Sequence, residues 1–189
     1  MKILKPVALA MLLLFAAAAR PLFAQSSGAQ TSDEACRSFV QSFYDWYTPI
    51  ALEDPPYPSS IDLVLQSRVL SPDLARQLTQ VINAAGRSGG DIWISVDPIV
   101  NTEDLWKKFA ARNVTRKGDH YLVEVYGVTP DKTDANPAVV PELVFQSGRW
   151  IFVNFHYPGN VVSSGNENMV SVLRRLRESI HGQDPQPGR

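Results

Sequence analysis

The sequence predicts an α+β fold, with N-terminal helices packed on a curved antiparallel β-sheet and a further helix at the C-terminus. Apolar residues recur with the period of a helix in the first half of the chain and again near its end. After Gly90 they follow the two-residue period of strands. Short turn sequences separate these strands, so consecutive strands are expected to pair as antiparallel hairpins. Helices on both sides of such a meander are expected to cover one face of the sheet.

Residues 1–24 have the pattern of a secretory signal peptide. Lys2 and Lys5 precede an apolar run over residues 7–19, and Ala24 is a small residue at a plausible cleavage point. The run is shorter than the roughly 20 apolar residues of a membrane-spanning helix. Cys36 lies too far beyond it for lipid attachment. We therefore expect a periplasmic or secreted protein without a transmembrane anchor in its mature form, and a retained anchor is the alternative.

The whole chain has the composition of an ordinary globular protein. Of the 189 residues, 44% are hydrophobic and 20% are charged, which excludes collagenous and disordered classes. After a Ser/Gly/Gln linker at 25–30, residues 31–181 suffice for one domain, and 182–189 read as a disordered tail. The net charge is −1, and loss of the basic leader makes it more negative, so nucleic acid is not an expected partner. A single cysteine, Cys36, excludes an internal disulfide, and we expect a buried thiol, with pairing between molecules as the alternative.

The strongest helical pattern lies at the start of the domain. Thr31 and Glu34 have the spacing of a capping box, and Pro49 is expected to end the helix. The residues on its apolar face, Trp46 among them, are expected in the core. They are Cys36, Phe39, Val40, Phe43, Trp46 and Tyr47.

Three further helices are expected. A short one covers about residues 61–66, and Ser71 can cap another that has Pro72 in its first turn. The last helix closes the domain with an apolar face. That face carries Met169, Val170, Leu173, Leu176 and Ile180.

Strands are expected near residues 109–115, from His120 onward, at 142–146 and at 149–157. Tight turns at 117–119 and 146–149 join them in pairs. Residues 129–141, rich in Pro, Asp and Thr, are expected to form a long hairpin loop that could be mobile. In the last strand, simple alternation puts Asn154 and His156 on one face with Trp150 and Phe152.

Three segments carry a resemblance to a known family. They are residues 39–47 (FVQSFYDWY), 97–104 (DPIVNTED) and 150–158 (WIFVNFHYP). Together they resemble the bacterial domain-of-unknown-function family 3828, which includes an envelope lipoprotein, over about residues 39–176. The order of elements is similar to the cystatin-like cone of nuclear transport factor 2-like proteins. The resemblance implies an envelope location and that fold, and it carries no catalytic residue over to this chain.

The acidic run after Trp93 is the sharpest local feature. Asp97, Asn101, Glu103 and Asp104 offer oxygen ligands that suit a hard cation such as calcium. The spacing does not match an EF-hand loop, so we expect no metal. A turn at Asp97 and a helix cap before residues 105–106 explain the run better, and a polar pocket or partner contact remains open.

His156 suggests a second kind of site. A cone interior could pair it with a carboxylate for proton transfer, and Asp45 and Asp97 are the available partners. Nucleophilic catalysis has no support, because Cys36 lacks a local basic helper and the chain has no Gly-x-Ser-x-Gly elbow. No cofactor is expected.

These observations favour a non-enzymatic binding module of the bacterial envelope whose partner is an envelope protein or a small ligand. Trp150 and Phe152 could form an interface, including one between two copies of the chain, because a sheet that is apolar on both faces must cover both. The alternative is a small-ligand or proton-transfer enzyme that uses a cone-shaped cavity. The candidate binding residues are Asp97, Asn101, Asp104, Trp150, Asn154 and His156.

Overall fold

The computed structural model describes residues 31–53, 59–87, 97–100, 106–129, 132–158 and 167–182. The predicted leader, its cleavage point at Ala24 and the linker lie outside these ranges, as does the predicted tail apart from Gly182, which ends a helix. The elements are α1 (Asp33–Leu52), α2 (Ser59–Ser67), α3 (Pro72–Arg87), β1 (Lys108–Lys117), β2 (His120–Val128), β3 (Val140–Gln146), β4 (Arg149–Tyr157), β5 (Glu167–Asn168) and α4 (Met169–Gly182). The α+β class is therefore confirmed.

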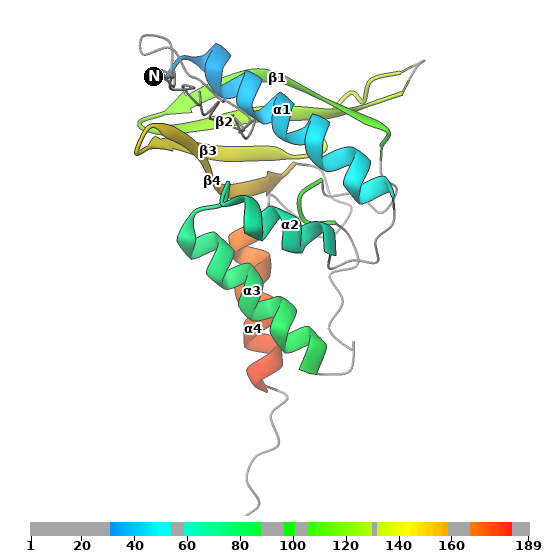
Figure 1. The fold of residues 1–189 in the computed structure, drawn as a ribbon, viewed down its shortest axis with the longest axis vertical. Coiled ribbons are helices and arrows are strands. Elements are labelled where there is room, and N and C mark those ends of the chain that lie inside the picture. The colour runs from blue at the N-terminus through cyan, green and yellow to red at the C-terminus, as the bar shows by residue number, and fades with distance from the viewer. Residues whose placement is uncertain are drawn as a thin grey trace, which may run out of the picture.

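The five strands form one open antiparallel sheet in sequence order, β1-β2-β3-β4-β5. The predicted hairpins at 117–119 and 146–149 are both present. Ser147 and Gly148 have φ of 52° and 78°, which is the left-handed backbone that a two-residue hairpin turn requires. In Figure 1, α1 lies across the sheet, whereas α2, α3 and α4 lie together beyond β4. The described part of the chain thus has a helical layer on one face of the sheet and a helical cluster at one edge.

The boundaries of α1 differ from the prediction at both ends. Ser32, not Thr31, caps the helix, because its hydroxyl accepts a hydrogen bond from the Ala35 N–H at 3.1 Å. The helix also continues through Pro49 to Leu52. Proline removes one helical hydrogen bond there, but the following N–H groups keep theirs, and Glu53 N donates to the Pro49 carbonyl at 3.0 Å.

The core lies between α1 and the sheet and extends into the helical cluster. Cys36, Val40 and Tyr44 of α1 are fully buried against the sheet, where Val123 and Val125 of β2 are buried as well. The buried thiol of Cys36 is confirmed. Burial, and secondarily the charge of Asp33, raises the pKa of Cys36 to about 12, so this cysteine carries no thiolate at neutral pH.

A β-bulge in β4 overturns the predicted alternation of its faces. Leu143 pairs with Phe152 and Glu142 with Asn154, so Val153 is an extra residue between the two pairs. Paired residues project from the same face. Trp150 and Phe152 therefore project into the core under α1, whereas Asn154 and His156 lie on the face turned away from it.

The predicted long hairpin loop between β2 and β3 is present, whereas the segment around Trp106 differs from expectation. The loop after β2 returns along that strand, where Ala138 N donates to the Val125 carbonyl at 2.9 Å and Asp134 N to the Gly127 carbonyl at 3.1 Å. Trp106, expected in a helix, is not helical. Its ring packs so closely on Gly127 that a Cβ there would lie 2.4 Å from it.

The edge strand β1 is covered by a side chain of α1. The Gln41 amide donates to the Phe109 carbonyl at 3.0 Å and accepts from the Ala111 N–H at 2.8 Å. One amide thus replaces the neighbouring strand that an edge lacks, and it leaves this stretch of backbone with fewer free groups for another chain to pair with.

We expect Gln41→Met to lower the free energy of unfolding by roughly 1–3 kcal/mol, because two hydrogen bonds to the edge of β1 are lost. Urea denaturation measures this change. Gln80→Met, on the exposed side of α3, is the matched control and should change stability by less than about 0.5 kcal/mol. Equal effects of the two substitutions would contradict the assignment.

Candidate functional site

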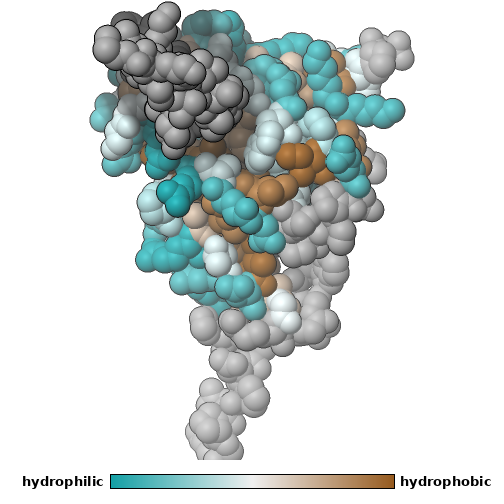
Figure 2. All heavy atoms as spheres, in the orientation of Figure 1, coloured by the Kyte–Doolittle hydropathy of each residue, from teal (hydrophilic) through white to brown (hydrophobic). Residues whose placement is uncertain are grey.

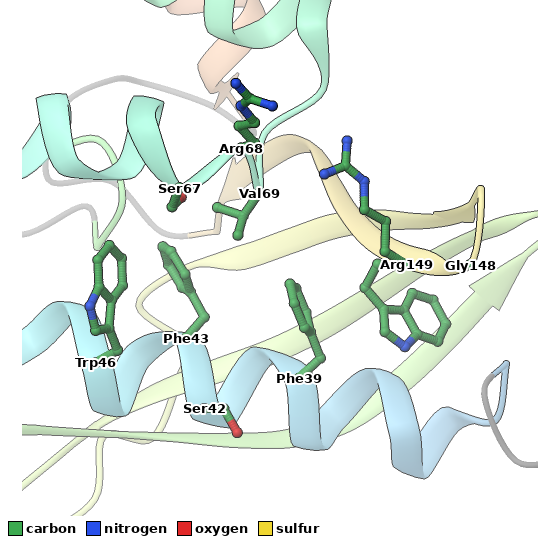
Figure 3. Close-up of a pocket in the computed structure, with 10 residues that line it drawn as sticks. Phe39, Ser42, Phe43, Trp46, Ser67, Arg68, Val69, Gly148 and Arg149 are labelled. Atoms are coloured by element: carbon green, nitrogen blue, oxygen red, sulfur yellow. The ribbon is translucent and has the colours of Figure 1, made fainter. Parts of the chain in front are cut away.

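A groove of about 600 Å3 lies between α1, the end of α2 and the turn between β3 and β4. Phe39, Phe43 and Trp46 rise into it from α1, and Arg68 and Arg149 stand on the opposite side (Figure 3). Ser42, Ser67, Val69, Gly148 and Trp150 complete its lining. The volume is that of a pocket for a small molecule, whose walls are typically apolar with a few polar groups.

The spacing of aromatic residues in α1 produces the apolar wall. Phe39, Phe43 and Trp46 are three and four residues apart, so they share one helix face. Phe39 and Phe43 pack on Phe152 of β4 with ring centroids 5.5 and 4.8 Å away. Trp46, expected in the core, is 39% exposed instead, because it lies where α1 passes the end of this aromatic cluster. Figure 2 shows hydrophobic residues gathered between α1 and the helices below it.

The connection from α2 to α3 forms the opposite wall and is tied to the sheet. Phe152 N donates to the Val69 carbonyl and Ser71 N to the Phe152 carbonyl, each at 2.8 Å. Ser71 then caps α3, as predicted, by accepting from Leu74 N at 3.2 Å. These hydrogen bonds hold Val69 beside β4 and place Arg68, the preceding residue, at the rim of the groove.

Arg68 has a backbone conformation that is unusual for its residue type. Its φ of 58° lies in the left-handed region that favours glycine after a helix, and its N–H bonds weakly to the Leu65 carbonyl at 3.4 Å. Neither Arg68 nor Arg149 has a carboxylate partner among the residues that the structure describes. Two positive charges that no described carboxylate pairs with therefore flank an aromatic surface.

Trp150 has a buried polar atom at the groove wall. The residue is 2% exposed, and its indole N–H has no hydrogen-bond partner within the described ranges. Leaving such a donor unpaired costs about 1–3 kcal/mol. Its ring packs edge-on against Tyr121 and Phe145, with centroids 4.8 and 5.1 Å away. Trp150 was predicted to form an interface, but it is buried and contributes to the wall of the groove.

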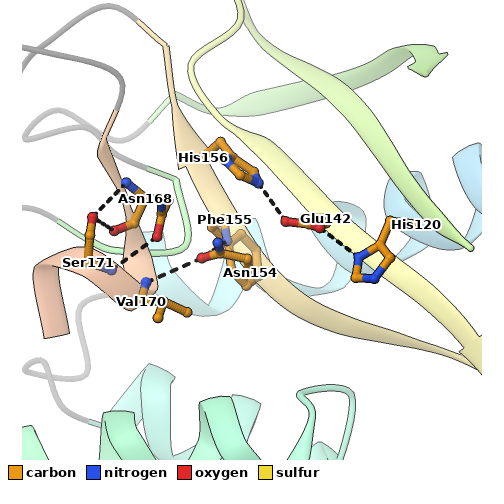
Figure 4. A network of polar contacts seen from close by, with 8 residues as sticks. All are labelled: His120, Glu142, Asn154, Phe155, His156, Asn168, Val170 and Ser171. Atoms are coloured by element: carbon orange, nitrogen blue, oxygen red, sulfur yellow. Dashed lines mark hydrogen bonds and ion pairs between the residues drawn. The ribbon is translucent and has the colours of Figure 1, made fainter. Parts of the chain in front are cut away.

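A polar row crosses the opposite face of the sheet. Glu142 of β3 contacts the His120 ring at 2.6 Å through one oxygen and the His156 ring at 2.7 Å through the other (Figure 4). The side chains of His120, Glu142 and His156 are 47%, 19% and 34% exposed, so solvent reaches all three. The carboxylate that accompanies His156 is thus Glu142, and neither Asp45 nor Asp97 takes that place.

This row does not form a metal site. The two imidazoles contact different oxygens of Glu142, so the three side chains do not converge on one point. Within the described ranges, no group of three or more His, Cys, Asp or Glu side chains is arranged to hold a metal ion.

Asn154 has a structural role at the start of α4. Its side-chain oxygen accepts from Phe155 N at 3.0 Å and from Val170 N at 3.3 Å (Figure 4). Asn168 caps the same helix by accepting from Ser171 N at 3.0 Å. Both side-chain oxygens therefore accept from backbone groups of the chain itself.

Asp97 is also held by internal contacts. Its carboxylate accepts from the Tyr47 hydroxyl at 2.6 Å and from Ile99 N at 2.8 Å. Removal from water raises the pKa of Asp97, although these hydrogen bonds oppose the change. Asn101, Glu103 and Asp104 lie outside the described residues, so the cation hypothesis for the acidic run stays untested.

The raised pKa of Asp97 predicts a pH dependence. The folded protein holds the carboxyl proton of Asp97 more tightly than the unfolded chain, in which this carboxyl has its ordinary pKa of 3.8. The contribution of Asp97 to stability is therefore complete below this pH and is lost as pH rises from there through the raised pKa of the folded state. Asp97→Asn keeps one oxygen that can accept from Ile99 N, can donate its amide N–H to the Tyr47 oxygen, and cannot ionise. The stability of the wild type relative to this variant should therefore decrease as pH rises above about 4 in thermal unfolding. Asp62→Asn, on the exposed side of α2, is the control. A stability of the wild type relative to Asp97→Asn that increases with pH would contradict the prediction.

Sequence reasoning missed the groove because its parts come from distant segments. Arg68 and Arg149 carry no local signal, since each becomes distinctive only beside residues from other elements; the same holds for Glu142 on the opposite face of the sheet. The helical spacing of Phe39, Phe43 and Trp46 is visible in the sequence, but there it predicts core positions.

None of the helices in the described ranges combines the length and hydropathy that spanning a bilayer requires.

No protein-family model, curated protein or solved structure matches this chain. The resemblance to family 3828 and to the nuclear transport factor 2-like cone therefore stays a prediction.

Proposed function

We propose that this chain is a non-enzymatic binding module of the bacterial envelope that holds a small apolar ligand in the groove between α1 and the α2–α3 connection. The observation that carries the proposal is the aromatic wall of Phe39, Phe43 and Trp46, in which Phe43 is buried, Phe39 is half-buried and Trp46 is exposed. Trp46 is 39% exposed although it lies on the apolar face of α1. Aromatic side chains left open in a concave site offer a ligand a large surface to remove from water.

The size of the groove favours a small molecule over a protein partner. Its volume of about 600 Å3 lies within the usual range for ligand pockets. The wall is also held in place, because Phe39 and Phe43 pack on Phe152 and the opposite side is hydrogen-bonded to β4. A preformed site spends little free energy on ordering when the ligand binds.

The envelope location rests on the leader pattern of residues 1–24, which predicts export and cleavage after Ala24. An exported module of this kind would meet its ligand outside the cytoplasm. A homodimer through the sheet is not part of the proposal, because Trp150 and Phe152 are buried under α1.

A proton-transfer enzyme is the second candidate, and the contact between His156 and Glu142 favours it. A histidine oriented by a carboxylate is a common general base. The pair lies on the face away from α1 and does not line the groove, so the groove supplies no enclosed space for a substrate beside it. The binding module is therefore the better supported function.

The proposal is tested with N-phenyl-1-naphthylamine, a neutral apolar dye whose fluorescence rises in apolar sites. We expect one dye to bind per chain, and Trp46→Ala to weaken binding by roughly tenfold, because an aromatic contact of about 1–2 kcal/mol is lost. Leu63→Ala is the matched control, since Leu63 is also 39% exposed but lies on α2 outside the groove. Its dissociation constant should stay within about twofold of the wild type.

Equal weakening by the two substitutions would place the dye on general apolar surface and contradict the proposal. Thermal unfolding of both variants shows whether the fold is intact, and circular dichroism checks their helix content.

A further inference from the structure

We propose, building on the proposed function, that the groove is selective for amphipathic anions: compounds with an apolar body and one acidic group. The aromatic wall would hold the body, and the guanidinium groups of Arg68 and Arg149 would pair with the acid. Both arginines line the same groove, and Figure 3 shows them together on the side opposite the aromatic residues of α1.

The charge pattern supports an anion. Three described arginines pair with carboxylates, namely Arg37 with Glu34, Arg76 with Asp73 and Arg175 with Glu167, whereas the other arginines of the described ranges, Arg68 and Arg149 among them, form no such ion pair there. What distinguishes Arg68 and Arg149 is that both line the groove. Within the described ranges, Arg68 and Arg149 have no carboxylate partner and no acidic side chain lines the groove. Guanidinium groups bind carboxylate, sulfonate or phosphate oxygens in a planar, two-pronged arrangement, and the apolar surroundings strengthen the attraction.

The backbone of Arg68 supports the same inference independently. A residue with φ of 58° after a helix is favoured as glycine, and a side chain at this position carries a conformational cost. Residues held in such conformations concentrate at ligand sites. The chain keeps a long cationic side chain where glycine would suit the fold better, and that side chain lines the groove.

The left-handed backbone of Arg68 allows a substitution that removes the charge without lowering stability. Arg68→Gly removes the charge while relieving the backbone, so the fold is expected to be at least as stable as the wild type. Loss of anion binding in this variant cannot then be attributed to unfolding.

The test compares two dyes that differ only in one sulfonate: N-phenyl-1-naphthylamine and 8-anilino-1-naphthalenesulfonate. For the wild type we expect the sulfonate to bind at least about tenfold more tightly than the neutral dye, and added salt to reduce this preference. Arg68→Gly should bring the preference to about twofold or less, with the neutral dye bound as before and the melting temperature not lowered. Arg149→Gln should reduce the preference as well.

Arg174→Gln, which removes an exposed arginine of α4 away from the groove, is the control and should leave the preference unchanged. Dodecanoate should displace the sulfonate dye, whereas its methyl ester should displace it at least about tenfold less well.

Each other outcome overturns the inference. Equal affinity of the wild type for the two dyes would reject the anion selectivity and leave the proposed function intact, whereas no binding of either dye would reject both. A preference that survives Arg68→Gly and Arg149→Gln would place the anion elsewhere. Sedimentation of the wild type is expected to show a monomer, and a dimer that Trp46→Ala dissociates would assign the groove to a second copy of the chain.

Discussion

Three tyrosine hydroxyls hold residues 97–100 inside the molecule, and this contact joins the helical layer to the sheet. Tyr44 of α1 donates to the Ile99 carbonyl and Tyr157 of β4 to the Pro98 carbonyl, each at 2.9 Å, while Tyr47 donates to Asp97. Ile99 is fully buried, so a carbonyl left unpaired there would cost about 1–3 kcal/mol. Tyrosine suits the task because its ring packs in the core while its hydroxyl satisfies the backbone.

The two edges of the sheet decide where the helices lie. Gln41 ties α1 to β1 at one edge, and the backbone around Val69 and Ser71 is bonded to β4 near the other. The groove is the space that remains between these attachments, where Phe39 and Phe43 lie against Phe152. Covering the strand edges and opening a ligand-sized groove are therefore two results of the same packing.

The bulge at Val153 separates two chemically different surfaces. On one side of β4 the residues beneath α1 are aromatic, and on the other Glu142 lies between His120 and His156. Without the extra residue, His156 would share the aromatic face, separated from Glu142, and its imidazole would have to be buried there at a high desolvation cost. The bulge keeps this polar row in contact with solvent and leaves the groove side apolar.

The sequence by itself determined the α+β class, the order of the strands, the tight turn at Ser147 and Gly148, and the cap of α3 at Ser71, because periodicity, turn chemistry and capping act between near neighbours in the chain. Only the tertiary structure decided which face His156 occupies, that α1 continues past Pro49, and that Trp46 and Arg68 border one groove. These features depend on strand register and on contacts between segments far apart in sequence. A one-residue shift in register moves a side chain to the other face, and no local pattern records it.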